Sequence, residues 1–215
     1  PSGLSINSST GEIDLAASTI QSYKIFYETS GAGCPNSSTF DLAVTAAGIA
    51  NNYSMSFDGS NDYLAPINQP ALDGLSAISV SLWFNYSSIG GAKGMIISNN
   101  ILWYIHLSSA TNLDYYNGSL NNITVSTSAN TWYHLGIVHN GTSLEVWLNG
   151  TSLGTTTVST PQNNIGQNLT IGAYKPGGFN YNWDGKLDEV AIWNTALTST
   201  QIQSIYNATS TNLTK

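Results

Sequence analysis

The sequence predicts an all-β protein, and three observations carry this prediction. Short runs of alternating apolar and polar residues recur along the 215-residue chain, bounded by Gly, Asn, Ser and Thr, which is the pattern of strands separated by turns. Asn-Gly and Asp-Gly pairs, which readily take the positive φ angles of tight hairpins, occur six times. Only the C-terminal region shows helical spacing of its apolar residues.

The clearest strands lie at 78–84, 132–139 and 143–149. The last two flank Asn140-Gly141 and are predicted to form a hairpin. In the first, the face expected to lie in the core consists of Ile78, Val80, Leu82 and Phe84. The opposite face, expected to be polar with one aromatic ring, consists of Ser79, Ser81 and Trp83.

The single predicted helix spans residues 199–207. Ile202 and Ile205 are three residues apart and therefore fall on one face of a helix. Thr198 or Ser199 precedes them as the cap, because a hydroxyl oxygen accepts hydrogen bonds from the unpaired N–H groups of the first turn.

The charge content excludes several classes of partner. Charged residues make up 8% of the chain, against about 25% in an average soluble domain, and the formal net charge is −7. The five basic residues are all Lys, so the chain has little with which to neutralise phosphates. No apolar run approaches the roughly 20 residues that span a bilayer. We therefore expect neither nucleic acid as a partner nor insertion into a membrane.

A shift in composition near residues 47–52 marks a domain boundary. Residues 1–46 carry a few short strands and little aromatic content, which is too little chain for a secure core of its own. We therefore predict a small β segment at 1–47 and a larger domain at 48–215.

Two family resemblances agree with this division. The larger domain contains, in order, SFDGSNDYL (56–64), ISVSLWFN (78–85), WYHLGIVHNGTSLEVWLNG (132–150), LTIGAY (169–174) and GKLDEVAIWNTALTSTQIQSIYN (185–207). Together these stretches resemble laminin G-like, concanavalin A-like jelly-roll domains, which are similar to the pentraxins. The smaller segment contains GLSINSSTGEIDL (3–15) and SYKIFYETSGAGCPNSSTFDLAVTA (22–46). It resembles the C-terminal part of an immunoglobulin-like repeat of bacterial surface and phage structural proteins.

The resemblance implies a fold and a class of function. The fold is a two-sheet antiparallel jelly-roll sandwich, preceded by a partial immunoglobulin-like β segment and ended by a short helix. The function is a non-enzymatic binding module on an extracellular, cell or virion surface, with glycans or cell-surface polysaccharide as partners in adhesion. The alternative is an assembly subunit of a phage fibre, capsid decoration or surface filament. A truncated N-terminal sheet favours self-association or contact with other subunits, because a neighbour can supply a missing strand.

A glycoside hydrolase is a third, less favoured function. Its chemistry needs two carboxylates about 5 Å or about 6.5–9.5 Å apart, and hydrolytic jelly rolls place them as Glu-x-Asp-x-Glu on one strand. No such motif begins at Glu12, Glu28, Glu145 or Glu189. We therefore predict no catalytic residue.

Asp58, Asp62 and Asp188 are the predicted ligands of a structural calcium ion. The resemblance implies that the strands carrying Asp58 and Asp188 pair, and calcium takes about six to eight oxygen ligands. The alternative is that Asp58 and Asp62 only cap a turn by accepting hydrogen bonds from backbone N–H groups.

Aromatic and amide residues crowd between Tyr174 and Asp184. Aromatic rings pack on the C–H faces of sugars and amide groups hydrogen-bond to neighbouring hydroxyls, so this stretch is a candidate glycan site. The alternative is that the rings fill the end of the core or contact another subunit. The predicted ligand-binding residues are Tyr115, Tyr116, Tyr174, Phe179, Asn180, Tyr181, Asn182 and Trp183.

Two further groups of residues are expected to be structural or surface features. His106, His134 and His139 lack metal-ligand spacing and are expected to make structural hydrogen bonds. Asn-x-Ser/Thr sequences are candidate glycosylation sites in a glycosylating host, or arise by chance in a chain rich in these residues. They begin at Asn7, Asn36, Asn52, Asn85, Asn117, Asn122, Asn140, Asn149, Asn168, Asn207 and Asn212.

Overall fold

The computed structural model describes residues 53–65, 72, 74–99, 102–161, 169–174 and 181–210, together with four strands in the first fifty residues. The chain divides into two compact units, Pro1–Ala50 and Asn51–Lys215. In the smaller unit, β1 (Ser5–Ile6) pairs with β2 (Ile13–Asp14) and β3 (Gln21–Glu28) pairs with β4 (Ser37–Val44), both antiparallel. The immunoglobulin-like character of this unit and the boundary at residues 47 and 48 stay predictions.

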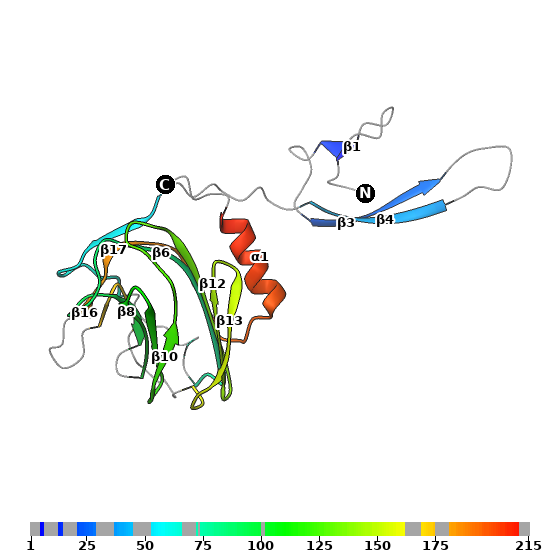
Figure 1. Ribbon diagram of the computed structural model, residues 1–215. Coiled ribbons are helices and arrows are strands. Elements are labelled where there is room, and N and C mark those ends of the chain that lie inside the picture. The colour runs from blue at the N-terminus through cyan, green and yellow to red at the C-terminus, as the bar shows by residue number, and fades with distance from the viewer. Residues whose placement is uncertain are drawn as a thin grey trace. The chain divides into compact units, whose positions relative to one another are not determined.

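The larger unit is a sandwich of two antiparallel sheets (Figure 1). The five-stranded sheet has the order β10 (Leu120–Thr124), β9 (Asn112–Tyr116), β8 (Trp103–Ser109), β7 (Met95–Asn99) and β14 (Leu169–Ile171). The six-stranded sheet has the order β13 (Thr151–Thr157), β12 (Ser143–Leu148), β11 (Tyr133–Asn140), β6 (Ala77–Tyr86), β17 (Asp184–Trp193) and β5 (Met55–Asp58). A short pair, β15 (Ala173–Tyr174) and β16 (Tyr181–Asn182), lies beside β7. This architecture confirms the predicted jelly-roll sandwich.

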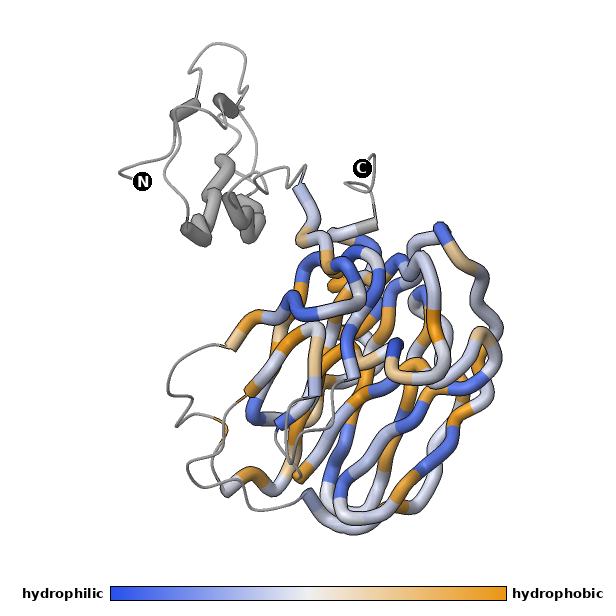
Figure 2. Tube along the Cα trace, turned by 90° about the vertical axis from the view of Figure 1, so that its left-hand side faces the viewer, coloured by the Kyte–Doolittle hydropathy of each residue, from blue (hydrophilic) through white to orange (hydrophobic). Residues whose placement is uncertain are grey.

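The core lies between the two sheets and is built from alternate residues of each strand. On β6 the buried core residues are Ile78, Val80, Leu82 and Phe84, as predicted. On β8 they are Trp103, Ile105 and Leu107. Figure 2 shows hydrophobic and hydrophilic positions alternating along the strands. Each fully buried large apolar side chain contributes about 1.5–3 kcal/mol, so this shared core stabilises both sheets.

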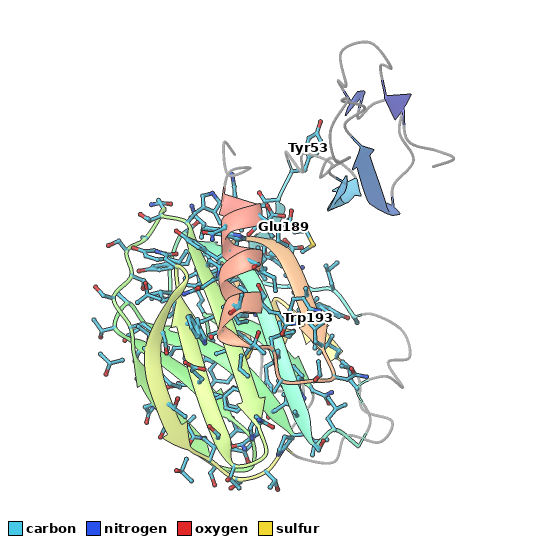
Figure 3. All side chains as sticks on the ribbon, turned by 90° about the vertical axis from the view of Figure 1, so that its right-hand side faces the viewer. Tyr53, Glu189 and Trp193 are labelled. Carbon is cyan, nitrogen blue, oxygen red and sulfur yellow. The ribbon has the colours of Figure 1, made fainter. Side chains whose placement is uncertain are left out.

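The opposite face of β6 is polar, as predicted, but it is also buried. The C-terminal helix α1 (Ser199–Ser210) lies across this side of the six-stranded sheet (Figure 1), and Figure 3 shows Glu189 and Trp193 on β17 beside it. Ser79 Oγ donates to the Thr195 carbonyl at 2.8 Å, and Trp83 Nε1 donates to Thr209 Oγ1 at 2.8 Å. The returning chain therefore satisfies the polar groups that alternation places outside the core.

Local signals predicted the hairpin and the helix correctly. β11 and β12 pair through the Asn140-Gly141 turn, with Asn140 opposite Ser143. Thr198 caps α1, because Gln201 N donates to Thr198 Oγ1 at 3.3 Å and Thr198 N donates to Gln201 Oε1 at 2.9 Å. The helix continues three residues beyond the predicted end. Within the described part of the chain, no helix has the length and apolar content needed to cross a membrane.

Candidate functional site

The outer face of the five-stranded sheet carries the strongest candidate site. Because side chains alternate, β8 turns Tyr104 and His106 outward while Ile105 between them enters the core. The antiparallel register then places Tyr104 opposite Tyr116 and His106 opposite Asp114 on β9. The face therefore carries two rows that cross the strands, one of tyrosines and one of polar side chains.

The tyrosine row consists of Tyr116, Tyr104, Tyr174 and Tyr181. The rings of Tyr104 and Tyr116 stack with their centroids 4.9 Å apart and their planes 7° from parallel. Tyr174 meets Tyr104 edge-on at 5.7 Å and Tyr181 at 6.3 Å. Tyr174 and Tyr181 are opposite each other in the β15–β16 pair, so this pair extends the row past β8.

The polar row consists of Asn122, Asp114 and His106. Asp114 Oδ1 accepts hydrogen bonds from Asn112 Nδ2 at 2.5 Å and from Asn122 Nδ2 at 2.6 Å. His106 Nδ1 lies 3.4 Å from Asp114 Oδ2, and His106 Nε2 lies 3.0 Å from the Lys93 carbonyl oxygen. A carbonyl only accepts, so Nε2 carries a proton in this arrangement.

Gly94 allows the chain to approach the back of this site. Its φ is +102°, and a Cβ at this position would lie 2.1 Å from the Leu107 carbonyl oxygen. Gly94 O accepts from Leu107 N at 2.8 Å, and Gly94 N donates to Asn182 O at 2.9 Å. These bonds hold the Lys93 carbonyl against His106 and hold β16 beside the sheet.

A cavity of about 290 Å³ opens between the rows and is lined by Met95, Tyr104, His106, Tyr174 and Tyr181. This volume is at the small end of the range of about 300–1,000 Å³ that small-molecule sites occupy. Aromatic rings and a hydrogen-bonding imidazole share its wall. The cavity therefore suits a small ring compound that presents both C–H groups and hydroxyls.

The hydroxyls of Tyr104 and Tyr174 stay protonated at neutral pH, because their pKa values are raised. Burial raises the pKa of Tyr104 to about 12, with smaller contributions from the Asp114 charge and the neighbouring tyrosines. Burial also raises the pKa of Tyr174, assisted by Tyr116 and Tyr181. Both hydroxyls can therefore donate as well as accept a hydrogen bond.

The structure brings only part of the predicted ligand-binding set together. Tyr116, Tyr174 and Tyr181 lie in the tyrosine row. Phe179 and Asn180 lie outside the described residues.

The expectation for Trp183, Tyr115 and Asn182 is corrected by their burial, which is complete or nearly so. Trp183 packs edge-on against Phe84 at 6.0 Å in the core. Tyr115 points to the inner side of β9, where its hydroxyl bonds His139 Nδ1 at 2.8 Å. Such rings fill the core, which was the alternative reading of this aromatic stretch.

The three predicted calcium ligands do not meet. Strands β5 and β17 pair as expected, but Asp58 is opposite Asp184, and Asp188 is four residues further along β17, about 13 Å away at the usual rise per residue. Asp58 Oδ1 accepts from Ser60 N at 2.8 Å, and Asp62 Oδ2 accepts from Asp58 N at 3.1 Å. These bonds match the turn-capping alternative.

Asp188 is buried and accepts from Glu189 N at 2.9 Å. Across the described residues, no three His, Cys, Asp or Glu side chains are grouped closely enough to hold a metal ion. The calcium ion itself stays a prediction, without a site in these three carboxylates.

The histidines divide into two kinds. His134 and His139 are fully buried and hydrogen-bonded, as expected of structural histidines. Burial lowers the pKa of His134 to about 4, so its ring is neutral at neutral pH. His106 differs from the expectation, because it lines the cavity.

The candidate glycosylation sites differ in exposure. Asn117 is fully buried, so its side chain is not presented to solvent, whereas Asn149 is exposed although its side-chain oxygen accepts from His134 N at 2.8 Å. The exposed candidates are Asn122, Asn140, Asn149 and Asn207, and Asn85 is half-buried. The remaining candidates lie outside the described side chains; they are Asn7, Asn36, Asn52, Asn168 and Asn212.

A second hollow, of about 570 Å³, lies between the edge strands β10 and β13. Aliphatic, amide and hydroxyl side chains line it, among them Leu120, Leu153 and Thr155. Its lining residues in the described chain include no aromatic ring, so it offers no stacking surface. The tyrosine face is therefore the stronger candidate.

Sequence reasoning missed Tyr104, His106 and Asp114. The signal was present as alternation in Trp103–Leu107, where the outward positions are a tyrosine and a histidine. Alternation alone does not show which strands are neighbours in the sheet. The contacts of Tyr104 with Tyr116 and of His106 with Asp114 could therefore not be predicted from the sequence.

Comparison with known proteins assigns this fold to a family. A family model described as the Concanavalin A-like lectin/glucanases superfamily (Laminin_G_3) matches residues 58–203. No curated protein sequence matches the chain significantly.

Several solved structures share the fold. A heptameric SAP-like pentraxin from Limulus polyphemus is 22% identical, with a TM-score of 0.58 over 74% of this chain and 84% of that one. A protein from Bacteroides ovatus ATCC 8483, whose suggested role is carbohydrate binding, is 16% identical, with a TM-score of 0.61 over 85% of this chain and 55% of that one. The CBM40 of the Ruminococcus gnavus IT-sialidase, bound to α2,3-sialyllactose, is 9% identical, with a TM-score of 0.58 over 72% of this chain and 95% of that one. At these identities the structures share the fold with this chain. The family model matches more than half of the chain, so the protein belongs to the concanavalin A-like lectin/glucanases superfamily.

Proposed function

We propose that the chain is a non-catalytic glycan-binding module that acts outside the cell or at a cell surface, with its ligand held on the outer face of the five-stranded sheet. The observation that carries this proposal is the pairing of the tyrosine row with the polar row around one cavity. The outer face of the six-stranded sheet also brings a carboxylate, an aromatic ring and an imidazole into register, as Asp188, Trp83 and His134, but these three side chains are buried.

The two rows offer the two interactions that a sugar ring needs. The C–H faces of a pyranose pack on aromatic rings, and Tyr104, Tyr174 and Tyr181 supply them around the cavity. Sugar hydroxyls need partners that both donate and accept, and the protonated hydroxyls of Tyr104 and Tyr174 provide both. Asp114 and Asn122 extend the hydrogen-bonding surface toward β10.

The similar proteins support a binding role. The Bacteroides ovatus protein has carbohydrate binding as its suggested role, and the Ruminococcus gnavus domain is a binding module bound to a sialylated sugar. Both reach this role with a sandwich like the one described above. A fold alone does not establish function, so the proposal rests on the tyrosine and polar rows of this chain.

A glycan array followed by calorimetric titration of the strongest hit tests the proposal. Tyr104→Ala and Tyr181→Ala each remove one ring from the cavity wall and should weaken binding at least tenfold, or about 1.4 kcal/mol. The control is Tyr53→Ala, because Tyr53 is an 86% exposed tyrosine of the same unit that does not line the cavity. Repeating the array with calcium and with EDTA tests the predicted calcium requirement.

Two results would count against the proposal. Equal losses in the control and the cavity variants would place the ligand elsewhere. An absence of array signal together with a stable oligomer in light scattering would favour the assembly alternative.

That alternative has one structural support: the edge strands β10 and β13 contain no charged residue, and charged residues are a common protection against edge pairing.

A further inference from the structure

Asp114 places a negative charge next to His106, which lines the cavity of the candidate site. It is 8% exposed, and its Oδ1 accepts hydrogen bonds from two amide groups. Its charge lies close to the cavity, because its Oδ2 is 3.4 Å from Nδ1 of His106, which lines the cavity. The same charge contributes, after burial, to the raised pKa of Tyr104. A ligand in the cavity therefore meets the field of a carboxylate held in place by its neighbours.

The described residues around the cavity offer no counter-charge to an anionic ligand. The chain contains no Arg, the side chain that binds carboxylates in bidentate fashion. The ammonium of Lys93, whose carbonyl contacts His106, is ion-paired with Asp184 and also donates to Ser88 Oγ at 2.8 Å. Burial alone would raise the pKa of Asp184, but the hydrogen bonds from Lys93 and Ser88 lower it, which keeps the ion pair formed.

His106 does not offset the negative charge of Asp114 for a ligand in the cavity. Its Nε2 proton already points to the Lys93 carbonyl, and its Nδ1 faces Asp114 Oδ2 at 3.4 Å. Both ring nitrogens are therefore directed at groups of the protein itself, the Lys93 carbonyl and the Asp114 carboxylate. Of the groups that face His106 from neighbouring strands, Asp114 on β9 is the charged one, and Tyr181 on β16 meets it edge-on.

We infer that the site, if it binds glycans as proposed above, selects uncharged sugars and rejects those that carry a carboxylate or sulfate, with Asp114 as the discriminating residue. The Ruminococcus gnavus domain, by contrast, is bound to a sialylated sugar in its structure. Two proteins that share this β-sandwich fold therefore need not bind the same class of sugar. The selecting group is the carboxylate that the sheet register places opposite His106, a residue of the cavity wall.

The test is an array of neutral glycans, each printed beside its sialylated or sulfated counterpart. The wild-type protein should bind the neutral members at least tenfold better than their anionic counterparts. Asp114→Asn removes the charge and keeps the shape, and it should raise the ratio of anionic to neutral binding at least tenfold. Asp62→Asn removes an exposed carboxylate from the turn after β5 and should leave that ratio unchanged.

A second measurement covers the case in which Asp114→Asn does not fold. Wild-type binding to the anionic glycans should strengthen between about 10 mM and 1 M salt, because the screening length falls from about 30 Å to about 3 Å. Equal wild-type binding to neutral and anionic members would overturn the inference while leaving glycan binding intact. A lack of signal from every glycan would instead refute the proposed function, and the inference with it.

Discussion

His134 couples the stability of the fold to pH. Its ring is fully buried between the six-stranded sheet and α1, 5.2 Å from the Trp83 ring and 5.5 Å from the Tyr206 ring. Its Nε2 bonds Ser81 Oγ at 2.8 Å, while its Nδ1 has no hydrogen-bond partner among the described residues. Protonation would place a second N–H, and a charge, where nothing accepts it.

The magnitude follows from the two pKa values. An unfolded histidine has a pKa of about 6.5, and burial lowers the pKa of His134 to about 4. Between these values the unfolded chain binds more protons than the folded one, so the free energy of unfolding rises with pH. At about 1.36 kcal/mol per unit, the burial penalty on the charged ring lowers the free energy of unfolding by roughly 3 kcal/mol as the pH falls from about 6.5 to about 4.

Urea unfolding followed by tryptophan fluorescence, repeated in steps from about pH 7.5 to about pH 4, measures this effect. The comparison is with His134→Gln, which has no titrating group at this position. The carboxylates titrate in both proteins, so the difference between their free energies of unfolding isolates His134. That difference should change by roughly 3 kcal/mol across the range. Parallel curves for the two proteins would refute the reasoning.

Two further substitutions test the packing around the site. Gly94→Ala should cost about 1–3 kcal/mol more than Gly90→Ala, because the φ angles are similar but only at position 94 would a Cβ meet the Leu107 carbonyl oxygen. Equal melting shifts for the two variants would show that the clash is absent. Tyr115→Phe should cost about 1–3 kcal/mol in urea unfolding, because it leaves the buried His139 Nδ1 without its donor. A change below about 0.5 kcal/mol would mean that this nitrogen finds another donor.

Elements that depend on neighbours in sequence were predicted well. The Asn140-Gly141 hairpin follows from the backbone preference of that pair, and the start of α1 follows from the Thr198 hydroxyl. The inward face of β6 follows from its alternation. In each case the deciding interaction lies within a few residues of the signal.

The site was predicted only in part, because its members meet through register. Tyr174 and Tyr181 were identified because their stretch of the sequence is rich in aromatic and amide residues. Trp183 belongs to the same stretch, two residues after Tyr181, but it points into the core. Strand alternation separates residues into two faces without saying which face is covered. Whether a ring binds a ligand or fills the core depends on the sheet packed behind it.

The sequence by itself determined an all-β chain with uncharged surfaces, one capped helix and the family to which the larger unit belongs. Tertiary structure alone decided that Tyr104 stacks on Tyr116, that Asp114 lies beside His106, and that Asp58 and Asp188 stay apart. The physical reason is that turns and caps are short-range interactions, whereas strand register and sheet packing join residues far apart in the chain.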